Sequence, residues 1–195
     1  MLHRRRRAPA SLAAAAAALV VLALPRFAPL GPPETAGLAA GTVVVDAQGA
    51  VLQRDASDGL RIPVALGAIA PVMLEATVSA EDRRFAQHPG LDPLALGRAI
   101  LTAGSQPSGA STITQQLARR LYLAGDTRPV LVRKAHESFI ALQLEARRSK
   151  ADILGLYLND VYYGRGAYGV EAAARAYFGT SAGNLDLAHA AYLAG

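Results

Sequence analysis

The chain of 195 residues contains no cysteine, and Lys134 and Lys150 are its only lysines. The absence of cysteine excludes disulfides, thiolate metal sites and a cysteine nucleophile. Arginine therefore supplies nearly all of the positive charge, and the formal net charge is +5. A basic balance favours anionic partners, which include nucleic acid, a membrane surface and a phosphorylated substrate, and composition does not choose among them. The length suits one domain with a short additional segment.

The N-terminal segment combines a basic cluster with an apolar run. Arg4–Arg7 precede a stretch without charge from Ala8 to Leu24, and Arg26 closes it. A basic flank before an apolar run predicts a single membrane anchor or a cleaved signal peptide, with the basic side in the cytoplasm. The run is shorter than the roughly 20 residues of a full span, so both alternatives stay open. In either case, we expect the residues after 1–26 to lie outside the cytoplasm.

The rest of the chain divides into a linker and a helical domain. Residues 27–60 are rich in Pro, Gly and Ala, and two β-branched or apolar runs around residues 46–49 predict a small β-hairpin near the membrane. Residues 61–195 show helical patterns, which makes the expected fold class mainly α. Asp92, Ser149 and the pair Thr112 and Gln115 are expected helix caps. The expected helices are 70–87, 92–103, a helix from 111 or 112, 130–148, 150–159, 170–177 and 185–193.

The segment from Glu81 to Asp92, EDRRFAQHPGLD, carries a first candidate acid or base. On a helix, Glu81, Phe85 and His88 share one face, and a carboxylate that is partly desolvated by an aromatic ring suits general acid/base chemistry. The same spacing fits an ordinary helix end with solvated carboxylates.

Hydroxyls and amides crowd the expected start of a helix in GASTITQQL. Ser111, Thr112, Gln115 and Gln116 follow a loop of small residues, and a helix N-terminus binds anions through its free N–H groups. Simple capping by Ser111 or Thr112 is the alternative.

A charged cluster follows in RKAHE. Arg133 and Lys134 lie four and three residues before Glu137, so two cations and a carboxylate share a helix face that continues through Ala141 and Leu144. Such a cluster suits phosphate binding at the edge of a cleft. A surface ion pair would have the same spacing, and no set of His, Asp and Glu shows the spacing of metal ligands.

These three segments, followed by SKADILGLYLN and GRGAYGVEAAARAYFG, resemble in order the five motifs of the family 51 peptidoglycan glycosyltransferases. The resemblance covers roughly residues 62–195 and includes the domains found in bifunctional class A penicillin-binding proteins. It implies a mostly helical, lysozyme-like fold. It also implies an enzyme that polymerises lipid II into β-1,4 glycan strands with inversion and releases undecaprenyl pyrophosphate.

The resemblance assigns roles to individual residues. Glu81 matches the general base, and Glu137 matches a second catalytic carboxylate. The other matches are substrate-binding or site-shaping residues (Asp82, Phe85, His88, Ser111, Thr112, Gln115, Gln116, Arg133 and Lys134) and structural motif residues (Lys150, Tyr157, Asn159 and Gly169). A divalent cation, Mg²⁺ or Mn²⁺, could lie near the pyrophosphate, although no metal ligand and no required cofactor is assigned.

The implied setting is the extracytoplasmic face of the cytoplasmic membrane. The implied partners are lipid II, the growing glycan strand, the membrane and other cell-wall synthesis proteins, with no nucleic acid. In the family the domain continues past Gly195, so residues 61–195 are expected to be a C-terminally truncated domain. No Ser-x-x-Lys motif follows that would indicate a transpeptidase.

Several positions depart from the family pattern, and two other functions stay open. Ala110, Arg119, Arg120, Gly155 and His189 replace residues that are common in the motifs. A lysozyme-like, glycan-cleaving enzyme would also use a catalytic Glu, but it has no need of the RKxxE cations. A non-catalytic, anchored cell-wall scaffold would have no need of either carboxylate.

Overall fold

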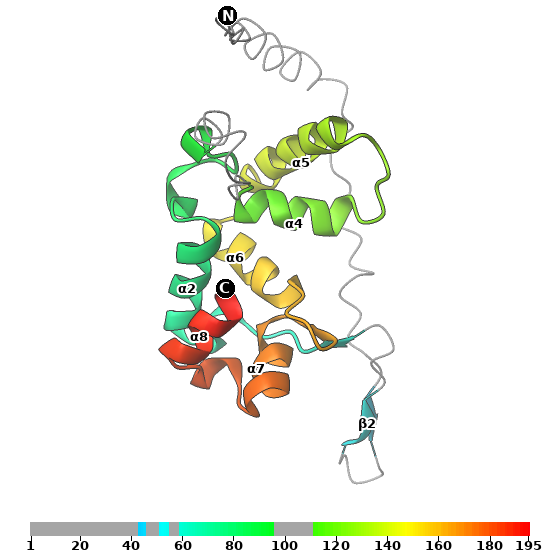
Figure 1. The fold of residues 1–195 in the computed structure, drawn as a ribbon, viewed down its shortest axis with the longest axis vertical. Helices are drawn as coiled ribbons and strands as arrows, with labels where there is room; N and C mark the ends of the chain where they lie inside the picture. Colours follow the sequence, from blue (N-terminus) through cyan, green and yellow to red (C-terminus); the bar gives the residue numbers. More distant parts are fainter. Residues whose placement is uncertain (1–42, 46–50, 55–58, 96–110) are drawn as a thin grey trace, which may run out of the picture.

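The computed structural model describes residues 43–45, 51–54, 59–95 and 111–195 (Figure 1). The expected anchor and most of the expected linker lie outside these residues, as does most of the helix expected over 92–103. Within the described ranges, no helix has the length and apolar character needed to cross a bilayer. The structure is mainly helical, as the sequence predicts.

In the part of the chain that the structure describes, two small β elements accompany the helices. Strands β1 (Val43–Val45) and β2 (Val51–Arg54) pair antiparallel, which confirms the expected hairpin. Strand β3 (Leu60–Arg61), whose first residue falls in the expected linker, pairs parallel with β4 (Ala167–Tyr168). The second pair was not predicted, because two residues are too few to show the alternating pattern of a strand.

Among the described residues, six longer helices form the body of the structure, with short 3-10 turns between some of them. The helices are α2 (Pro71–Glu81), α4 (Ile113–Tyr122), α5 (Val130–Glu145), α6 (Lys150–Asp160), α7 (Val170–Phe178) and α8 (Leu187–Ala194). The 3-10 turns are Leu66–Ala68, Phe85–Gln87 and Ala182–Asn184. Residues 93–95 are also helical.

Local capping sets the starts of α4 and α6 and the end of α7 close to where the sequence predicts them. Thr112 accepts a hydrogen bond from Gln115 N and forms a complete capping box, and Ser149 does the same with Asp152. Gly179 ends α7 in the left-handed conformation at φ 65°. Helix α8 begins two residues later than expected, because the Asp186 side chain accepts from His189 N and acts as the N-cap.

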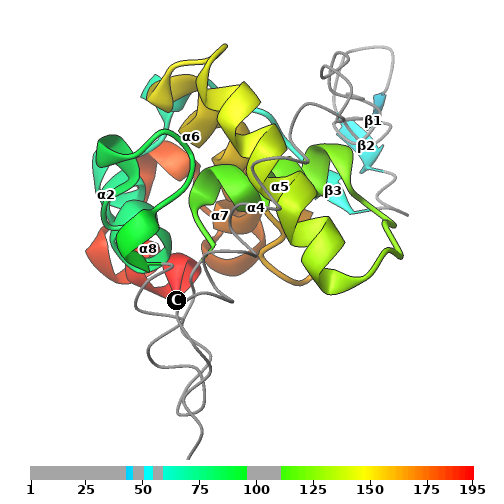
Figure 2. The same ribbon diagram turned by 90° about the horizontal axis from the view of Figure 1, so that it is seen from above.

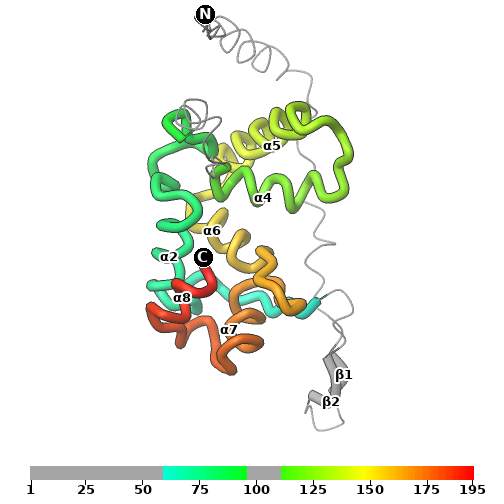
Figure 3. Tube along the Cα trace, viewed as in Figure 1, coloured from blue at the N-terminus to red at the C-terminus, as the bar shows by residue number. Residues whose placement is uncertain are grey.

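Helix α4 joins two layers of apolar packing. Ile113 and Leu117 are fully buried in the main core, which draws on α2, α6, α7 and α8 as well. Ala118 turns to the other side and packs with Ile140, Ala141 and Leu144 of α5. Figures 1 and 2 show α4 and α5 side by side, and the tube in Figure 3 shows the same pair beyond α6 from α7 and α8. Residues at the start of α4 therefore lie where the two layers meet.

The helix expected over residues 70–87 is wrong beyond Glu81. Helix α2 ends there, and Asp82 leaves the helix with φ −159° and ψ 76°. The Asp82 carboxylate accepts from Ile113 N of α4, so a contact distant in sequence replaces another helical turn. The helical face expected to join Glu81, Phe85 and His88 does not exist.

Candidate active site

Glu81 is the last residue of α2 and faces α4. Its side chain is partly buried, and Glu81 Oε2 accepts a hydrogen bond of 2.7 Å from Gln116 Nε2. Gln116 lies one turn after the Thr112 cap, and its Oε1 accepts a hydrogen bond of 3.2 Å from the Tyr157 hydroxyl of α6. A line of side chains from three helices therefore ends on the Glu81 carboxylate.

Tyr157 determines which way the Gln116 side-chain amide is oriented in this chain of hydrogen bonds. Burial, with a further contribution from the negative charge of Glu81, raises the pKa of Tyr157 well above its usual range. The hydroxyl keeps its proton near neutral pH and donates a hydrogen bond to Gln116 Oε1. The amide nitrogen of Gln116 is then the atom that points to Glu81, and its orientation is assigned by this hydrogen-bond network.

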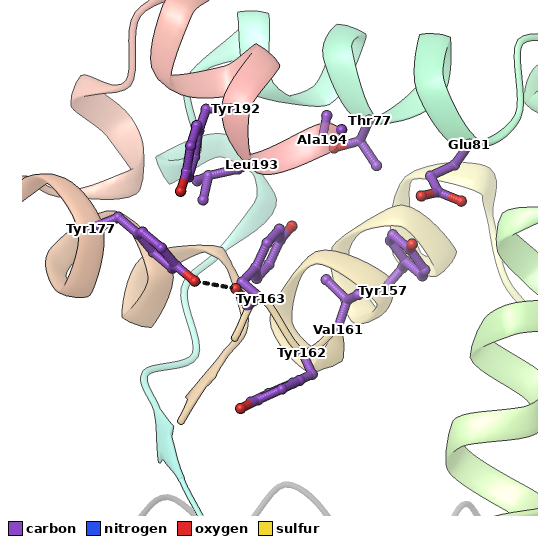
Figure 4. Close-up of a pocket in the computed structure, with 11 residues that line it drawn as sticks. Thr77, Glu81, Tyr157, Val161, Tyr162, Tyr163, Tyr177, Tyr192, Leu193 and Ala194 are labelled. Carbon is purple, nitrogen blue, oxygen red and sulfur yellow. Dashed lines mark hydrogen bonds between the residues drawn. The ribbon is translucent and has the colours of Figure 1, made fainter. Parts of the chain in front are cut away.

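A cavity of about 360 Å³ opens beside Glu81 (Figure 4). Tyr157, Tyr163 and Tyr177 lie along it, and the Tyr177 hydroxyl donates to Tyr163 O at 2.7 Å. Tyr162 and Tyr192 complete the aromatic part of the wall. Hydroxyls and ring faces of this kind suit a polar ligand with C–H surfaces, such as a sugar.

Asp82 and His88 connect the first motif to the start of α4. His88 Nδ1 accepts from Gly90 N at 3.2 Å, so the ring proton is on Nε2, which lies 3.0 and 3.1 Å from the Asp82 carboxylate oxygens. Asp82 Oδ2 also accepts from Ile113 N at 3.2 Å. Both side chains are buried, so they hold the segment after Glu81 in place.

Phe85 and Lys150 form a second connection. The Phe85 ring is buried, and Lys150 Nζ lies 4.4 Å from its centroid. The same ammonium donates to His88 O and to Glu145 Oε1, each at 2.7 Å. Glu145 Oε1 also accepts from Thr114 Oγ1 at 2.6 Å. Lys150 therefore ties the start of α6 to both the first motif and the end of α5.

The second motif contacts both the first and the third. Thr112 Oγ1 donates to Gly90 O at 2.6 Å, and Gln115 Nε2 donates to Ser138 Oγ at 3.1 Å. Ser111 Oγ accepts from Lys134 Nζ at 2.8 Å. Of the four polar residues predicted here, Gln116 is the one that reaches Glu81.

Glu137 is 1% exposed and sits between two cations, which confirms the predicted cluster and excludes a surface ion pair. Lys134 Nζ donates to its Oε2 at 2.6 Å, and Arg133 Nε lies 3.9 Å from its Oε1. The Oε1 atom is buried without a hydrogen bond. Lys134 thus links Glu137 to Ser111, two residues before α4.

A second cavity, of about 470 Å³, lies at the other end of α4. Its cationic wall consists of Arg61, Arg119, Arg120 and Arg133. Asp160 pairs with Arg120 at 2.5 Å and lies 3.9 Å from Arg61, so it neutralises part of this charge. The remaining guanidinium groups suit an anionic ligand such as a phosphate.

Two cationic side chains lie beside the Glu137 carboxylate. Mg²⁺ and Mn²⁺ need several oxygen ligands, whereas Lys134 and Arg133 occupy the surroundings of this carboxylate. Within the described ranges, no group of three or more His, Asp or Glu side chains is placed to hold a metal. At this cluster the ammonium and guanidinium groups of the chain supply the positive charge.

Asn159 and Gly169 have structural surroundings. Asn159 Oδ1 accepts from Val64 N at 2.9 Å, and its Nδ2 donates to Val64 O at 3.0 Å. Gly169 has φ 81°, and a Cβ there would meet Asn159 O at 2.6 Å. These contacts position the segment before α2 and the turn after α6.

Two groups beside the carboxylates were not predicted as site residues. The first is the set of cavity tyrosines at positions 162, 163, 177 and 192, which come from separate segments and show no shared spacing. The second comprises Arg61 with Arg119 and Arg120. In the sequence, Arg119 and Arg120 stand out only as a departure from a family motif, although two arginines on the turn after Gln116 are a usable signal for a cationic surface. Tyr157, predicted as structural, donates a hydrogen bond to Gln116, which in turn donates to Glu81.

Comparison with known proteins places this site in a family. Residues 48–195 match the transglycosylase family, more than half of the chain. Over 138 residues, 69% of the chain, it is 46% identical to penicillin-binding protein 1A of Escherichia coli and 45% identical to penicillin-binding protein 1A of Vibrio cholerae. It is also 49% identical over 128 residues, 64% of the chain, to penicillin-binding protein 2D of Bacillus subtilis. The matched segments span only 16%, 16% and 18% of these relatives. The chain therefore belongs to the transglycosylase family, known as the family 51 glycosyltransferases.

Proposed function

We propose that this chain is a peptidoglycan glycosyltransferase that joins lipid II units into β-1,4 glycan strands in bacterial cell-wall synthesis. Membership of the transglycosylase family supports the reaction class. The observation that carries the assignment is the Glu81 carboxylate, held by Gln116 at 2.7 Å beside a tyrosine-lined cavity. The proposed location is the extracytoplasmic face of the cytoplasmic membrane, with the segment 1–26 as its anchor.

Glu81 is the proposed general base. It takes the proton from the 4-OH of the acceptor sugar as that oxygen attacks C1 of the donor sugar. The bond from C1 to the pyrophosphate oxygen breaks, and attack from the opposite face inverts the anomeric centre. Gln116 positions the carboxylate without competing for the proton, because its amide nitrogen only donates.

The cations of the third motif are the proposed partners of the leaving group. The negative charge that the reaction releases ends on the lipid pyrophosphate. Arg133 lines the arginine-rich cavity and neighbours Glu137, while Lys134 joins Glu137 to Ser111. Stabilising a departing phosphate by fixed cations in a partly water-excluded site is an effective use of such groups. Glu137 would hold both cations in position.

The test compares synthesis with cleavage. The full chain in detergent is incubated with fluorescent lipid II, and in parallel with preformed glycan strands. We expect labelled strands from the first reaction and no shortening in the second. Shortened strands without synthesis would instead identify a glycan-cleaving enzyme, and neither activity in a folded protein would overturn the assignment.

A further inference from the structure

Asp160 is a buried carboxylate on the wall of the arginine-lined cavity. It is the last residue of α6 and is 4% exposed. Arg120 of α4 contacts it twice, because Arg120 Nε donates to Asp160 Oδ2 and Arg120 Nη2 donates to the backbone Asp160 O, each at 2.5 Å. The backbone contact links α4 to the end of α6 without using the carboxylate. The carboxylate is therefore not required to hold the two helices together.

Arg61 faces the same carboxylate at a longer distance. Its Nη2 lies 3.9 Å from Asp160 Oδ1, and its guanidinium carbon lies 3.9 Å from the centroid of the Tyr168 ring. Its Nε is buried and has no hydrogen-bond partner among the described residues. A buried donor without a partner is costly, so this guanidinium favours an additional anion. Tyr168 thus holds in place a cation that Asp160 satisfies only in part.

The carboxylates on the cavity wall have different partners. The arginines that line the cavity are Arg61, Arg119, Arg120 and Arg133. Asp126 also lines the cavity, but it pairs at 2.7 Å with Arg128, which lies outside the lining. Asp160 is therefore the wall carboxylate whose side chain pairs with a cavity arginine.

A phosphate group would compete with the Asp160 carboxylate for the same donors. Guanidinium groups bind carboxylate and phosphate oxygens with the same bidentate geometry, and a phosphate has more charge and more acceptor oxygens. The Arg120 side chain is 27% exposed, so it can contact a ligand in the cavity. Exchange of one anion for the other leaves the guanidinium paired throughout, which keeps the cost of the exchange low.

We infer that Asp160 is an internal competitor for the anionic ligand of this cavity. The carboxylate holds Arg120 and faces Arg61, and a phosphate-bearing ligand takes over both guanidinium groups as it binds. Asp160 thereby weakens binding and keeps a highly charged ligand exchangeable. The inference rests on the proposed function in one respect, because the diphosphate of a lipid-linked sugar is then the ligand. A purely structural Arg120–Asp160 pair is the competing account.

The cavity wall offers a matched control for a charge-removing variant. Asp160→Asn removes the charge but keeps an acceptor for Arg120 Nε and the backbone contact, so we expect the fold to be retained. Asp126→Asn removes the same charge from the same wall but releases Arg128 instead. Titration calorimetry measures the binding of inorganic pyrophosphate to each full-length chain in detergent, at low and at high salt. Circular dichroism verifies the helix content.

We expect Asp160→Asn to lower the Kd for pyrophosphate roughly tenfold, the effect of about one further charge-assisted hydrogen bond. Asp126→Asn should change the Kd by less than about threefold, an effect of net charge that salt screens. Adding Arg120→Gln to Asp160→Asn should remove most of the gain, whereas adding Arg128→Gln should not. A Kd for Asp160→Asn no lower than that for Asp126→Asn would overturn the inference. A gain that survives Arg120→Gln, or no pyrophosphate binding by any chain, would also overturn it.

The unsubstituted chain provides a second test that does not depend on the folding of Asp160→Asn. The Nε–H signal of Arg120 in the magnetic resonance spectrum of nitrogen-labelled protein is assigned by its loss in Arg120→Lys. Pyrophosphate should shift this signal, because the Nε–H group exchanges the Asp160 carboxylate for a phosphate oxygen. An unchanged signal at saturating pyrophosphate would contradict the exchange.

Initial rates with fluorescent lipid II separate this inference from the proposed function. Asp160→Asn should lower KM with little change in kcat, because the released guanidinium group strengthens substrate binding. A chain that forms no strands but shows the expected pyrophosphate exchange would contradict the proposed function and leave the exchange in place. Strand formation together with an unchanged pyrophosphate Kd in Asp160→Asn would support the function and overturn the inference.

Discussion

The side-chain amide of Gln116 holds the Glu81 carboxylate at 2.7 Å, across the junction of α4 and α2. Gln116 can hold it in only one orientation, because its oxygen already accepts from Tyr157 at 3.2 Å. The position of the proposed base is therefore set by contacts between residues distant in sequence. Gln116 lies 35 residues after Glu81, and Tyr157 lies 41 residues after Gln116. Variants along this line separate positioning from chemistry.

Removal of the tyrosine hydroxyl by Tyr157→Phe should slow synthesis modestly. It deletes one neutral hydrogen bond, worth about 1 kcal/mol, which corresponds to a loss of about fivefold in rate. Gln116→Leu deletes the bond to the carboxylate itself, worth about 1.5–3 kcal/mol, so a loss of roughly ten- to hundredfold is expected. Initial rates of strand formation from lipid II measure both. If Tyr157→Phe reduced the rate as much as Gln116→Leu or more, this would contradict the account in which Tyr157 acts on Glu81 only through Gln116.

Lys134→Met should destabilise the fold as well as abolish phosphate binding. It leaves the buried Glu137 carboxylate with Arg133 at 3.9 Å as its remaining cation, and an unsatisfied buried charge costs about 2 kcal/mol or more. The double variant Lys134→Met with Glu137→Leu should recover most of that stability without recovering activity. Urea unfolding monitored by circular dichroism gives the free energies. An unfolding free energy of the single variant equal to that of the unsubstituted chain would contradict a stabilising role for the Lys134–Glu137 pair.

Most features that depend on residues close together in the sequence could be predicted, and most features that depend on contacts between distant residues could not. The Thr112 and Ser149 caps, the Gly179 stop and the Glu137 cluster depend on residues within five positions of one another, and all are present. The end of α2 was misplaced because Asp82 forms its decisive contact with Ile113, 31 residues later. A helical pattern carries no information about such a contact.

The same reason explains which parts of the candidate site were missed. Five tyrosines meet at the Glu81 cavity, but they come from α6, α7, α8 and the turn between α6 and β4. Phe85 and His88, which the resemblance assigns to the first motif, do not share a helix face with Glu81, because α2 ends at Glu81. Only the tertiary arrangement shows that they are buried behind the site.

The Arg84–Asp92 ion pair predicts a specific dependence of stability on pH. The hydrogen bond from Arg84, with those from Ala95 N and Leu94 N, lowers the pKa of Asp92 from 3.8 to about 2. Because the folded pKa is depressed, the stabilisation is fully present above pH 3.8 and is lost as the pH falls through about 2. Asp92→Asn keeps a cap oxygen but loses the charge. The difference in unfolding free energy between the two chains should be constant near neutral pH and shrink below pH 4 (approximately the unfolded pKa). A difference that grows on acidification would have the wrong sign.

Gly155→Ala should stabilise the chain. Gly155 lies inside α6, and a Cβ there would meet Leu66 at 3.7 Å, an ordinary van der Waals contact. Replacing a helix-interior glycine by alanine is worth about 1 kcal/mol. Gly169→Ala is the opposite case, since its φ of 81° and the 2.6 Å approach to Asn159 O should cost at least about 1 kcal/mol. Urea midpoints that move in the same direction for both variants would contradict this account.

The most direct test of the central claim is strand formation from fluorescent lipid II by Glu81→Gln, compared with Glu75→Gln as the control. Glu75 is an exposed carboxylate on the same helix, so both variants lose one negative charge from α2. We predict that Glu75→Gln polymerises like the unsubstituted chain and that Glu81→Gln forms no strands while keeping the same helix content. Polymer from Glu81→Gln at a rate close to that of the control would contradict the assignment of Glu81 as the base.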